Sequence, residues 1–144
     1  MTVINIDVRS TLSPDEVLRV LTDFSERRAE VWPGVDADSF TVHDQGDGFA
    51  EVTEGNSIGW ERERYTWDAT SGTVAAETLD SNLWASGSRW DYRITPVEGG
   101  TQVGVRLERH GKGIKGKLIQ ALIPVIGKKM IADSLESALK PAQP

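Results

Sequence analysis

The hydrophobic residues of this chain follow two periods, one of two residues through most of the sequence and one of three to four residues near its end. Alternating apolar and polar positions predict strands, whereas apolar steps of three and four place side chains on one face of an α-helix. The helical period runs from Gly111 to Lys140. The sequence therefore predicts a sheet that is followed by one long C-terminal helix.

Two shorter helices are predicted near the N-terminus, after a first strand at Val3 to Val8. Ser13 suits the N-cap of a helix and Pro14 suits its first position, so a helix is expected to begin there. The run Ser25 to Val31 predicts a second short helix, which ends at Trp32-Pro33-Gly34.

Six strands are predicted between these helices and the last one, at residues 40–43, 49–53, 60–68, 73–79, 88–95 and 101–109. Short turns join them, most of them rich in glycine. Consecutive antiparallel strands form a meander, and the closing helix is expected to cover one face of it. Residues 1–144 are long enough for one domain with a sizeable core.

This order of elements, with Pro14-Asp15-Glu16 opening the first helix, resembles the helix-grip (START-like) superfamily. Trp60 to Asp68 is similar to the central strand of its bacterial polyketide cyclase/dehydrase-like branch. Asp80-Ser81-Asn82 and Gly87 to Trp90 are similar to the next turn and strand. The resemblance implies an α+β fold in which a curved antiparallel sheet of about seven strands wraps around the long C-terminal helix. It also implies an apolar cavity between the sheet and that helix.

Aromatic residues are the first candidates for the wall of such a cavity. Tyr65 and Trp67 share one face of their predicted strand, and Trp90 and Tyr92 share one face of another. Rigid aromatic side chains with a polar tip suit a pocket for a flat or acyl ligand, and they equally suit a filled core. We interpret all four as candidate ligand-binding residues.

Glu63 is the candidate with the sharpest chemistry. Alternation places Glu61 and Glu63 on the face that carries the two aromatic residues of the same strand. A carboxyl group that faces an apolar cavity has a raised pKa or a bound partner, and either marks a functional site. Glu63 is therefore a candidate ligand-binding residue and a candidate catalytic residue. If the strand is turned the other way, Arg62 and Arg64 face the interior instead.

The first half of the C-terminal helix has an unusual pattern. Pro124 interrupts it, and the stretch from Leu118 to Ile126, which includes Leu122, is apolar on nearly all sides. Proline bends or divides a helix, and a helix that is apolar all round must bury both faces or contact a partner. Leu118, Leu122 and Ile126 are therefore candidates for a movable wall of the pocket. A homodimer contact and transient membrane docking are the alternatives, and we favour the pocket wall or the dimer.

The start of this helix matches the glycine and lysine spacing of a phosphate-binding loop at Gly111 to Lys117. However, Leu118 occupies the position where a serine or threonine hydroxyl must reach magnesium. The glycines are better explained by a sharp turn from sheet to helix. We interpret Lys112, Lys115 and Lys117 as solvated side chains, with an anionic head group as the alternative ligand.

The composition of the chain argues against several classes of function. The formal net charge is −6, which argues against a nucleic-acid partner, because phosphate binding needs a basic face. The chain has no cysteine, which excludes thiol catalysis, and its two histidines lack metal-ligand spacing, so neither a metal nor a cofactor is predicted. No signal peptide pattern and no apolar run of about 20 residues is found. These features predict a cytoplasmic protein without stable membrane insertion.

The leading functional prediction is binding or transport of a small hydrophobic ligand, such as a lipid, isoprenoid or polyketide-like metabolite. The first alternative is a polyketide cyclase/dehydratase-like enzyme, in which Glu63 is the general acid or base and Tyr65 or Tyr92 orients the substrate. A stress or interaction protein without a dedicated ligand is the second alternative. The sequence alone leaves catalysis open and leans toward binding.

Overall fold

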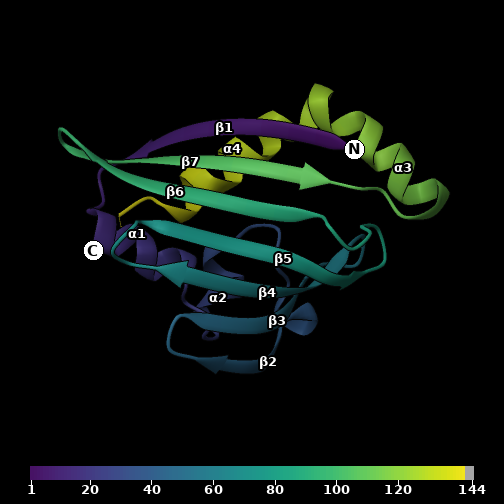
Figure 1. Ribbon diagram of the computed structural model, residues 1–144, viewed down its shortest axis with the longest axis horizontal. Coiled ribbons are helices and arrows are strands. Elements are labelled where there is room, and N and C mark those ends of the chain that lie inside the picture. The colour runs from purple at the N-terminus through teal and green to yellow at the C-terminus, as the bar shows by residue number, and fades with distance from the viewer. Residues whose placement is uncertain (142–144) are drawn as a thin grey trace.

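The protein is described by a computed structural model for residues 1–141, in which helices cover one face of a seven-stranded antiparallel sheet (Figure 1). The strands are β1 (Thr2–Ser10), β2 (Thr41–Gly46), β3 (Phe49–Gly55), β4 (Trp60–Asp68), β5 (Thr73–Ser81), β6 (Arg89–Val97) and β7 (Gly100–Arg109). Their order in the sheet is β1-β7-β6-β5-β4-β3-β2. The predicted meander is therefore confirmed for β2 to β7, and β1 pairs with the last strand of that meander.

The short helices lie on the covered face of the sheet, as Figure 1 shows. They are α1 (Pro14–Leu21), α2 (Arg27–Val31) and the short 3-10 turn η1 (Ala37–Ser39). The expected start of α1 is confirmed: the Ser13 hydroxyl accepts a hydrogen bond from the Glu16 backbone N–H, and the Glu16 carboxylate accepts one from the Ser13 N–H. These reciprocal bonds fix where the chain turns from β1 into α1.

The C-terminal helical segment has three parts: α3 (Gly113–Leu122), a π-helical turn η2 (Ile123–Gly127) and α4 (Lys128–Ala138). Pro124 lies in the π-helical turn and has no backbone N–H to donate, which accounts for the break in the helical pattern. In Figure 1, α4 passes behind β1 and β7, whereas α3 continues past the end of the sheet. Only the second half of the segment is therefore gripped by the sheet.

Gly116 explains how α3 approaches the rest of the chain. A Cβ atom at this position would lie 2.2 Å from the carbonyl oxygen of Leu83, so only glycine allows this approach. Gly113 has a φ of +67°, which favours glycine at the turn into the helix. Glycine thus serves the turn from sheet to helix, as expected, and the antiparallel sheet offers no nucleotide-binding arrangement.

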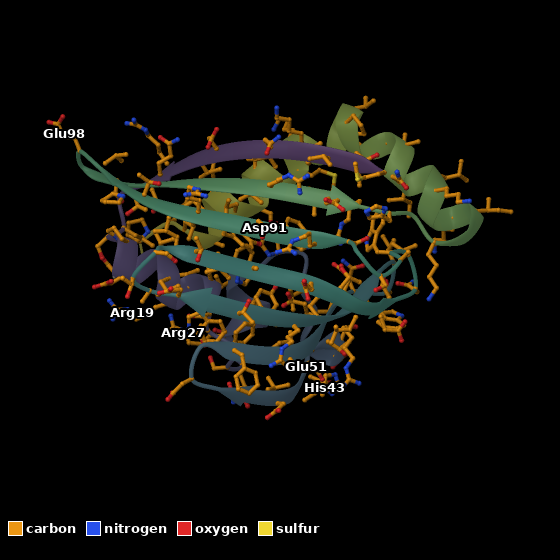
Figure 2. The ribbon with its side chains drawn as sticks, viewed as in Figure 1. Arg19, Arg27, His43, Glu51, Asp91 and Glu98 are labelled. Atoms are coloured by element: carbon orange, nitrogen blue, oxygen red, sulfur yellow. The ribbon has the colours of Figure 1, made fainter. Side chains whose placement is uncertain are left out.

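The two faces of the sheet differ in chemistry. Side chains of the inner face form a core with α1 and α4, in which Leu21, Leu107 and Leu135 are almost completely buried. The outer face carries ion pairs such as Glu51–Arg62 and Asp91–Arg89, and Figure 2 shows Glu51 and Asp91 on this outer face. This division confirms the α+β helix-grip fold. No helix within residues 1–141 is long and apolar enough to cross a bilayer.

Candidate functional site

A cavity of about 720 Å³ lies between the inner face of the sheet, the α2 region and α4. This volume falls within the range of pockets that enclose small organic ligands. Its walls are largely apolar and aromatic, with a few polar groups among them. Residues that line it include Arg28, Trp32, Glu54, Glu61, Glu63, Tyr65, Trp84, Trp90, Tyr92, Val105, Met130, Ile131, Ser134 and Leu135.

Strand β4 supplies three consecutive inward side chains to this cavity, those of Glu61, Glu63 and Tyr65. The alternation of the strand therefore places the two glutamates on the face that the sequence predicts, with Arg62 and Arg64 on the outer face. Pairing with β5 shifts between Arg62 and Glu63, so that Leu79 of β5 has no partner on β4. This bulge lets both Thr78 and Ser81 of β5 face inward beside the glutamates.

Arg28 forms the first buried ion pair of the site. Its Nε lies 2.6 Å from Oε2 of Glu54, and its Nη2 donates a hydrogen bond of 3.0 Å to the Tyr65 hydroxyl. Its Nη1 donates to the carbonyl oxygens of Leu21 and Asp23 at the end of α1. Arg28 therefore connects α1, β3 and β4, and it stays charged because its partners satisfy the guanidinium.

The Arg28 guanidinium is also packed against aromatic rings. Its central carbon lies 4.5 Å from the ring centre of Phe24, 5.2 Å from that of Tyr65 and 5.5 Å from that of Trp32. Cations favour the negative faces of aromatic rings. The aromatic wall of the cavity thus helps to hold this charge in place.

Arg109 forms a second buried ion pair, at the end of β7. Its two terminal nitrogens lie 2.6 and 2.8 Å from the two carboxylate oxygens of Glu61, which is bidentate geometry. Thr78 donates a further hydrogen bond of 2.8 Å to Glu61. The guanidinium lies 4.7 Å from the ring centre of Trp84 and 5.0 Å from that of Trp90. Each arginine of the site is therefore paired with one glutamate and with aromatic rings.

Glu63 lies between these two pairs and is only 2% exposed. Its Oε2 atom is buried and has no hydrogen-bond partner within residues 1–141. Burial, together with the nearby carboxylates of Glu61 and Glu54, raises the pKa of Glu63 well above its ordinary value. Burial also acts to raise the pKa of Glu54, but the Arg28 guanidinium outweighs it and lowers that pKa. These opposite shifts favour the protonated form of Glu63 and the ionised form of Glu54.

This protonation state balances the charge of the site. With Glu63 neutral, the two arginines are matched by the carboxylates of Glu54 and Glu61. Ionising Glu63 would add an unpaired negative charge to a buried site, which is costly. Chemically, the cavity therefore offers an apolar surface and a neutral carboxylic acid that can donate a proton or a hydrogen bond.

The raised pKa of Glu63 predicts a pH dependence of stability. Between the ordinary carboxyl pKa of about 4.3 and the raised pKa in the folded protein, the folded state holds a proton that the unfolded state has released. Stability should therefore fall as pH rises through this range, by up to about 1.4 kcal/mol per pH unit. Glu63→Gln has no such group to titrate. Its free energy of unfolding in urea, relative to that of the unsubstituted protein, should therefore rise from pH 5 to pH 7.

Glu98→Gln is the matched control, because Glu98 lies in the exposed turn between β6 and β7 (Figure 2). Its stability should run parallel to that of the unsubstituted protein over the same pH range. A Glu63→Gln curve that also ran parallel would contradict a buried neutral Glu63.

The structure places the sequence candidates in two groups. Glu63, Tyr65, Trp90 and Tyr92 all line the cavity. Trp67 does not line it; its ring packs 6.0 Å from that of Phe24 in the core. The alternation that selected Trp67 identifies the inner face of the sheet but not the part of that face where the cavity lies.

Three candidates from the C-terminal segment are not part of the cavity wall. Leu118, Leu122 and Ile126 do not line the cavity, and more than half of each side chain surface is exposed. They lie on the outer side of α3 and the π-helical turn, whereas Ile119 and Ile123 of the same two elements pack against the core. The wall that this segment contributes comes from α4, through Met130, Ile131, Asp133, Ser134 and Leu135.

Sequence reasoning missed several polar or aromatic residues of the site, among them Arg28, Glu54, Arg109, Trp32 and Trp84. Two of them had a usable signal. Glu54 continues the inward alternation of Ala50 and Val52, and Arg109 continues that of the apolar positions of β7. Arg28 and Trp32 lie in and after a helix of five residues, where no periodicity marks the inner side.

Metal binding finds no support in this arrangement. No group of three histidine, cysteine, aspartate or glutamate side chains within the described part of the chain is placed to hold an ion. Two glutamates of the cavity, Glu54 and Glu61, are instead paired with arginines.

Together, the sheet that grips α4 and the cavity between them define a START-like fold. The chain belongs to the family described as polyketide cyclase/dehydrase and lipid transport, whose model matches residues 1–140. A comparison with curated proteins by sequence finds no match.

Several solved structures share the fold. An aromatase/cyclase named Zhui from a Streptomyces species is 14% identical, with a TM-score of 0.77 over 96% of this chain and 91% of that one. A START superfamily protein from Mycobacterium smegmatis is 14% identical, with a TM-score of 0.75 over 95% and 96%. Norcoclaurine synthase from Thalictrum flavum, solved with dopamine and hydroxybenzaldehyde, is 15% identical, with a TM-score of 0.66 over 94% and 84%. At these identities the similarity shows the fold alone.

Proposed function

We propose that this protein binds a small hydrophobic molecule, of the lipid, isoprenoid or polyketide-like class, in the cavity between the sheet and α4. The observation that carries the proposal is a volume of about 720 Å³ lined by Trp84, Trp90 and Tyr92. Burial of apolar ligand surface against such walls contributes about 25 cal/mol per Å². The cavity is therefore large enough to give useful affinity through apolar contact.

Two unpartnered polar atoms support a ligand that also carries a hydroxyl or carbonyl group. Nε1 of Trp32 and Oε2 of Glu63 are buried, lack hydrogen-bond partners within the described residues, and belong to side chains that border the cavity. Buried polar groups are normally satisfied. A carbonyl oxygen accepts from the Trp32 N–H, and a hydroxyl group can bond to Glu63. A negatively charged ligand group is disfavoured beside the carboxylates of the site.

Catalysis of the cyclase or dehydratase type is the second candidate function. A neutral carboxylic acid inside an apolar cavity is suited to protonate an oxygen that leaves or becomes an enol. The similarity in fold to an aromatase/cyclase is in keeping with this chemistry. In this reading Glu63 is the proton donor, and Tyr92, which also lines the cavity, orients the substrate.

Native mass spectrometry of the purified protein, followed by solvent extraction and identification of any bound molecule, tests the proposal. We expect a one-to-one complex with an apolar, uncharged molecule that dissociates on denaturation. Absence of such a complex, together with failure to bind any lipid, isoprenoid or aromatic polyketide offered in excess, would contradict the binding function.

Glu63→Gln separates binding from catalysis once the molecule is known. A binding protein should keep its affinity within about tenfold, because the amide retains hydrogen-bonding capacity. An enzyme should lose about 10²- to 10⁴-fold in turnover, the usual contribution of a general acid. Full turnover by Glu63→Gln would remove the catalytic role of this residue.

A further inference from the structure

An apolar surface without a partner covers the outer side of α3, the π-helical turn and the start of α4. We define it as the α3 surface, and its six large side chains are between 52% and 83% exposed. They are Ile114, Leu118, Leu122, Val125, Ile126 and Met130. Figure 2 shows side chains projecting from α3 away from the sheet. Exposed apolar patches of this kind mark contact sites.

The same segment is strongly basic. Lys112, Lys115, Lys117, Lys128 and Lys129 lie within 18 residues, and no acidic residue occurs between Glu108 and Asp133. The chain as a whole has a formal charge of −6. Positive charge is therefore concentrated around the α3 surface of an otherwise acidic protein.

Three of these lysines have charges that no acidic side chain neutralises. Lys115, Lys117 and Lys128 form no ion pair within the described part of the chain, whereas Lys112 lies 3.7 Å from Asp80 and Lys129 lies 2.6 Å from Asp133. Exposed apolar side chains surrounded by free lysines match the chemistry of a bilayer that contains anionic lipids.

A second copy of this chain is a poorer occupant of the α3 surface. In a twofold-symmetric dimer the same patch meets itself, which would bring the lysines of one copy toward those of the other. Like charges across an interface oppose association. An anionic bilayer instead provides opposite charge at the height of the lysines and an apolar interior for the leucine and isoleucine side chains.

Met130 connects this surface to the cavity. It is 66% exposed on the α3 surface and also lines the cavity wall formed by α4. Met130 therefore borders both the cavity and the α3 surface.

We propose that the α3 surface docks reversibly on anionic membranes and places the cavity beside the bilayer. The transfer of a ligand between cavity and bilayer rests on the proposed function, whereas the docking itself does not. The protein lies on the membrane in this arrangement, with the sheet and α4 remaining outside the bilayer.

Flotation with vesicles tests the docking without any ligand in the cavity. We expect binding to vesicles of phosphatidylcholine with phosphatidylglycerol, weaker binding to phosphatidylcholine alone, and loss of binding as salt increases. Leu118→Gln/Val125→Gln should weaken binding at least about tenfold, since two exposed apolar side chains can no longer enter the bilayer. Lys115→Gln/Lys117→Gln should weaken it roughly 25-fold, at about fivefold per lysine.

Matched controls separate this site from general effects. Ile58→Gln replaces a similarly exposed apolar residue outside the α3 surface, and Arg9→Gln/Arg93→Gln removes the same charge from exposed strand positions. Each should change vesicle binding by no more than about twofold. Val105→Phe, which fills the cavity, should bind vesicles normally, so failure of the cavity proposal would leave docking intact.

The proposal is overturned if anionic vesicles do not bind, or if the α3 variants bind as well as the unsubstituted protein. Sedimentation equilibrium identifies the alternative occupant. A concentration-dependent dimer that Leu118→Gln/Val125→Gln abolishes, in the absence of vesicle binding, would assign the α3 surface to a second copy of the chain.

Discussion

Arg28→Met should lower the free energy of unfolding by about 3–5 kcal/mol, which is a large part of the 5–15 kcal/mol typical of a domain. The substitution leaves Glu54 buried without the cation that lies 2.6 Å from it. It also removes the donors to the Leu21 and Asp23 carbonyl oxygens that join α1 to the sheet. In both cases a charge or an acceptor stays buried but loses its partner, which costs more free energy than losing a surface contact.

Arg62→Met is the matched control for this prediction. Arg62 lies 2.7 Å from Glu51, a distance close to that of the buried pair, but its side chain is 43% exposed. Solvent-exposed ion pairs contribute about 0–1 kcal/mol, so Arg62→Met should remain within about 1 kcal/mol of the unsubstituted protein. Urea unfolding followed by tryptophan fluorescence measures both variants.

A second variant shows whether the buried charge causes the loss. Adding Glu54→Gln to Arg28→Met should recover part of the stability, because a neutral amide costs less to bury than a carboxylate. Equal destabilisation by Arg28→Met and Arg62→Met would show that the Arg28–Glu54 pair does not hold the site together.

Much of the fold follows from local patterns in the sequence. Alternation identifies most of the strands because they have one covered face, and the Ser13-Pro14 start of α1 is a local signal. The same alternation directs Glu63 inward, so the candidate carboxyl could be found without a structure. Following the alternation to the last inward position of β3 and of β7 would also have found Glu54 and Arg109.

Other parts of the site depend on tertiary contacts that leave no local pattern. Arg28 is buried because α1, β3 and β4 all supply acceptors to it, although the chain around it resembles any short polar helix. Trp32 and Trp84 lie in connecting segments, where neither the helical nor the strand period applies.

The direction of α3 could not be predicted for a similar reason. Pro124 indicates a break, but a break alone does not say which half stays on the sheet. The close approach of Gly116 to the Leu83 carbonyl and the hydrogen bond from the Gln120 side chain to Thr2 hold α3 beyond the end of the sheet. Leu118 therefore became exposed although it is as apolar as the buried Leu135.

Filling the cavity should abolish most ligand binding without loss of the fold. Val105 of β7 is buried and lines the cavity, so Val105→Phe extends a ring into the empty volume. A ligand that buries about 100 Å² less apolar surface loses about 2.5 kcal/mol, which is roughly 60-fold in affinity. Ser134→Phe, from the opposite wall on α4, should have a similar effect if Val105→Phe folds poorly.

Two controls make the result specific to the cavity. Val97→Phe makes the same substitution at the end of β6, outside the cavity, and should leave affinity unchanged. Leu118→Gln/Val125→Gln should also leave affinity unchanged, because a ligand in the cavity does not touch the α3 surface. Weaker binding by this variant would show that the ligand binds the α3 surface instead. Far-UV circular dichroism verifies that each variant is folded.

Fluorescence titration with Nile red, a neutral apolar dye, is therefore the measurement that tests the cavity most directly. The unsubstituted protein should bind it saturably at one site, and Val105→Phe and Ser134→Phe should weaken binding roughly 60-fold while both controls match the unsubstituted protein. Equal binding by the filled and the unfilled proteins, or no saturable binding at all, would contradict a ligand site between the sheet and α4.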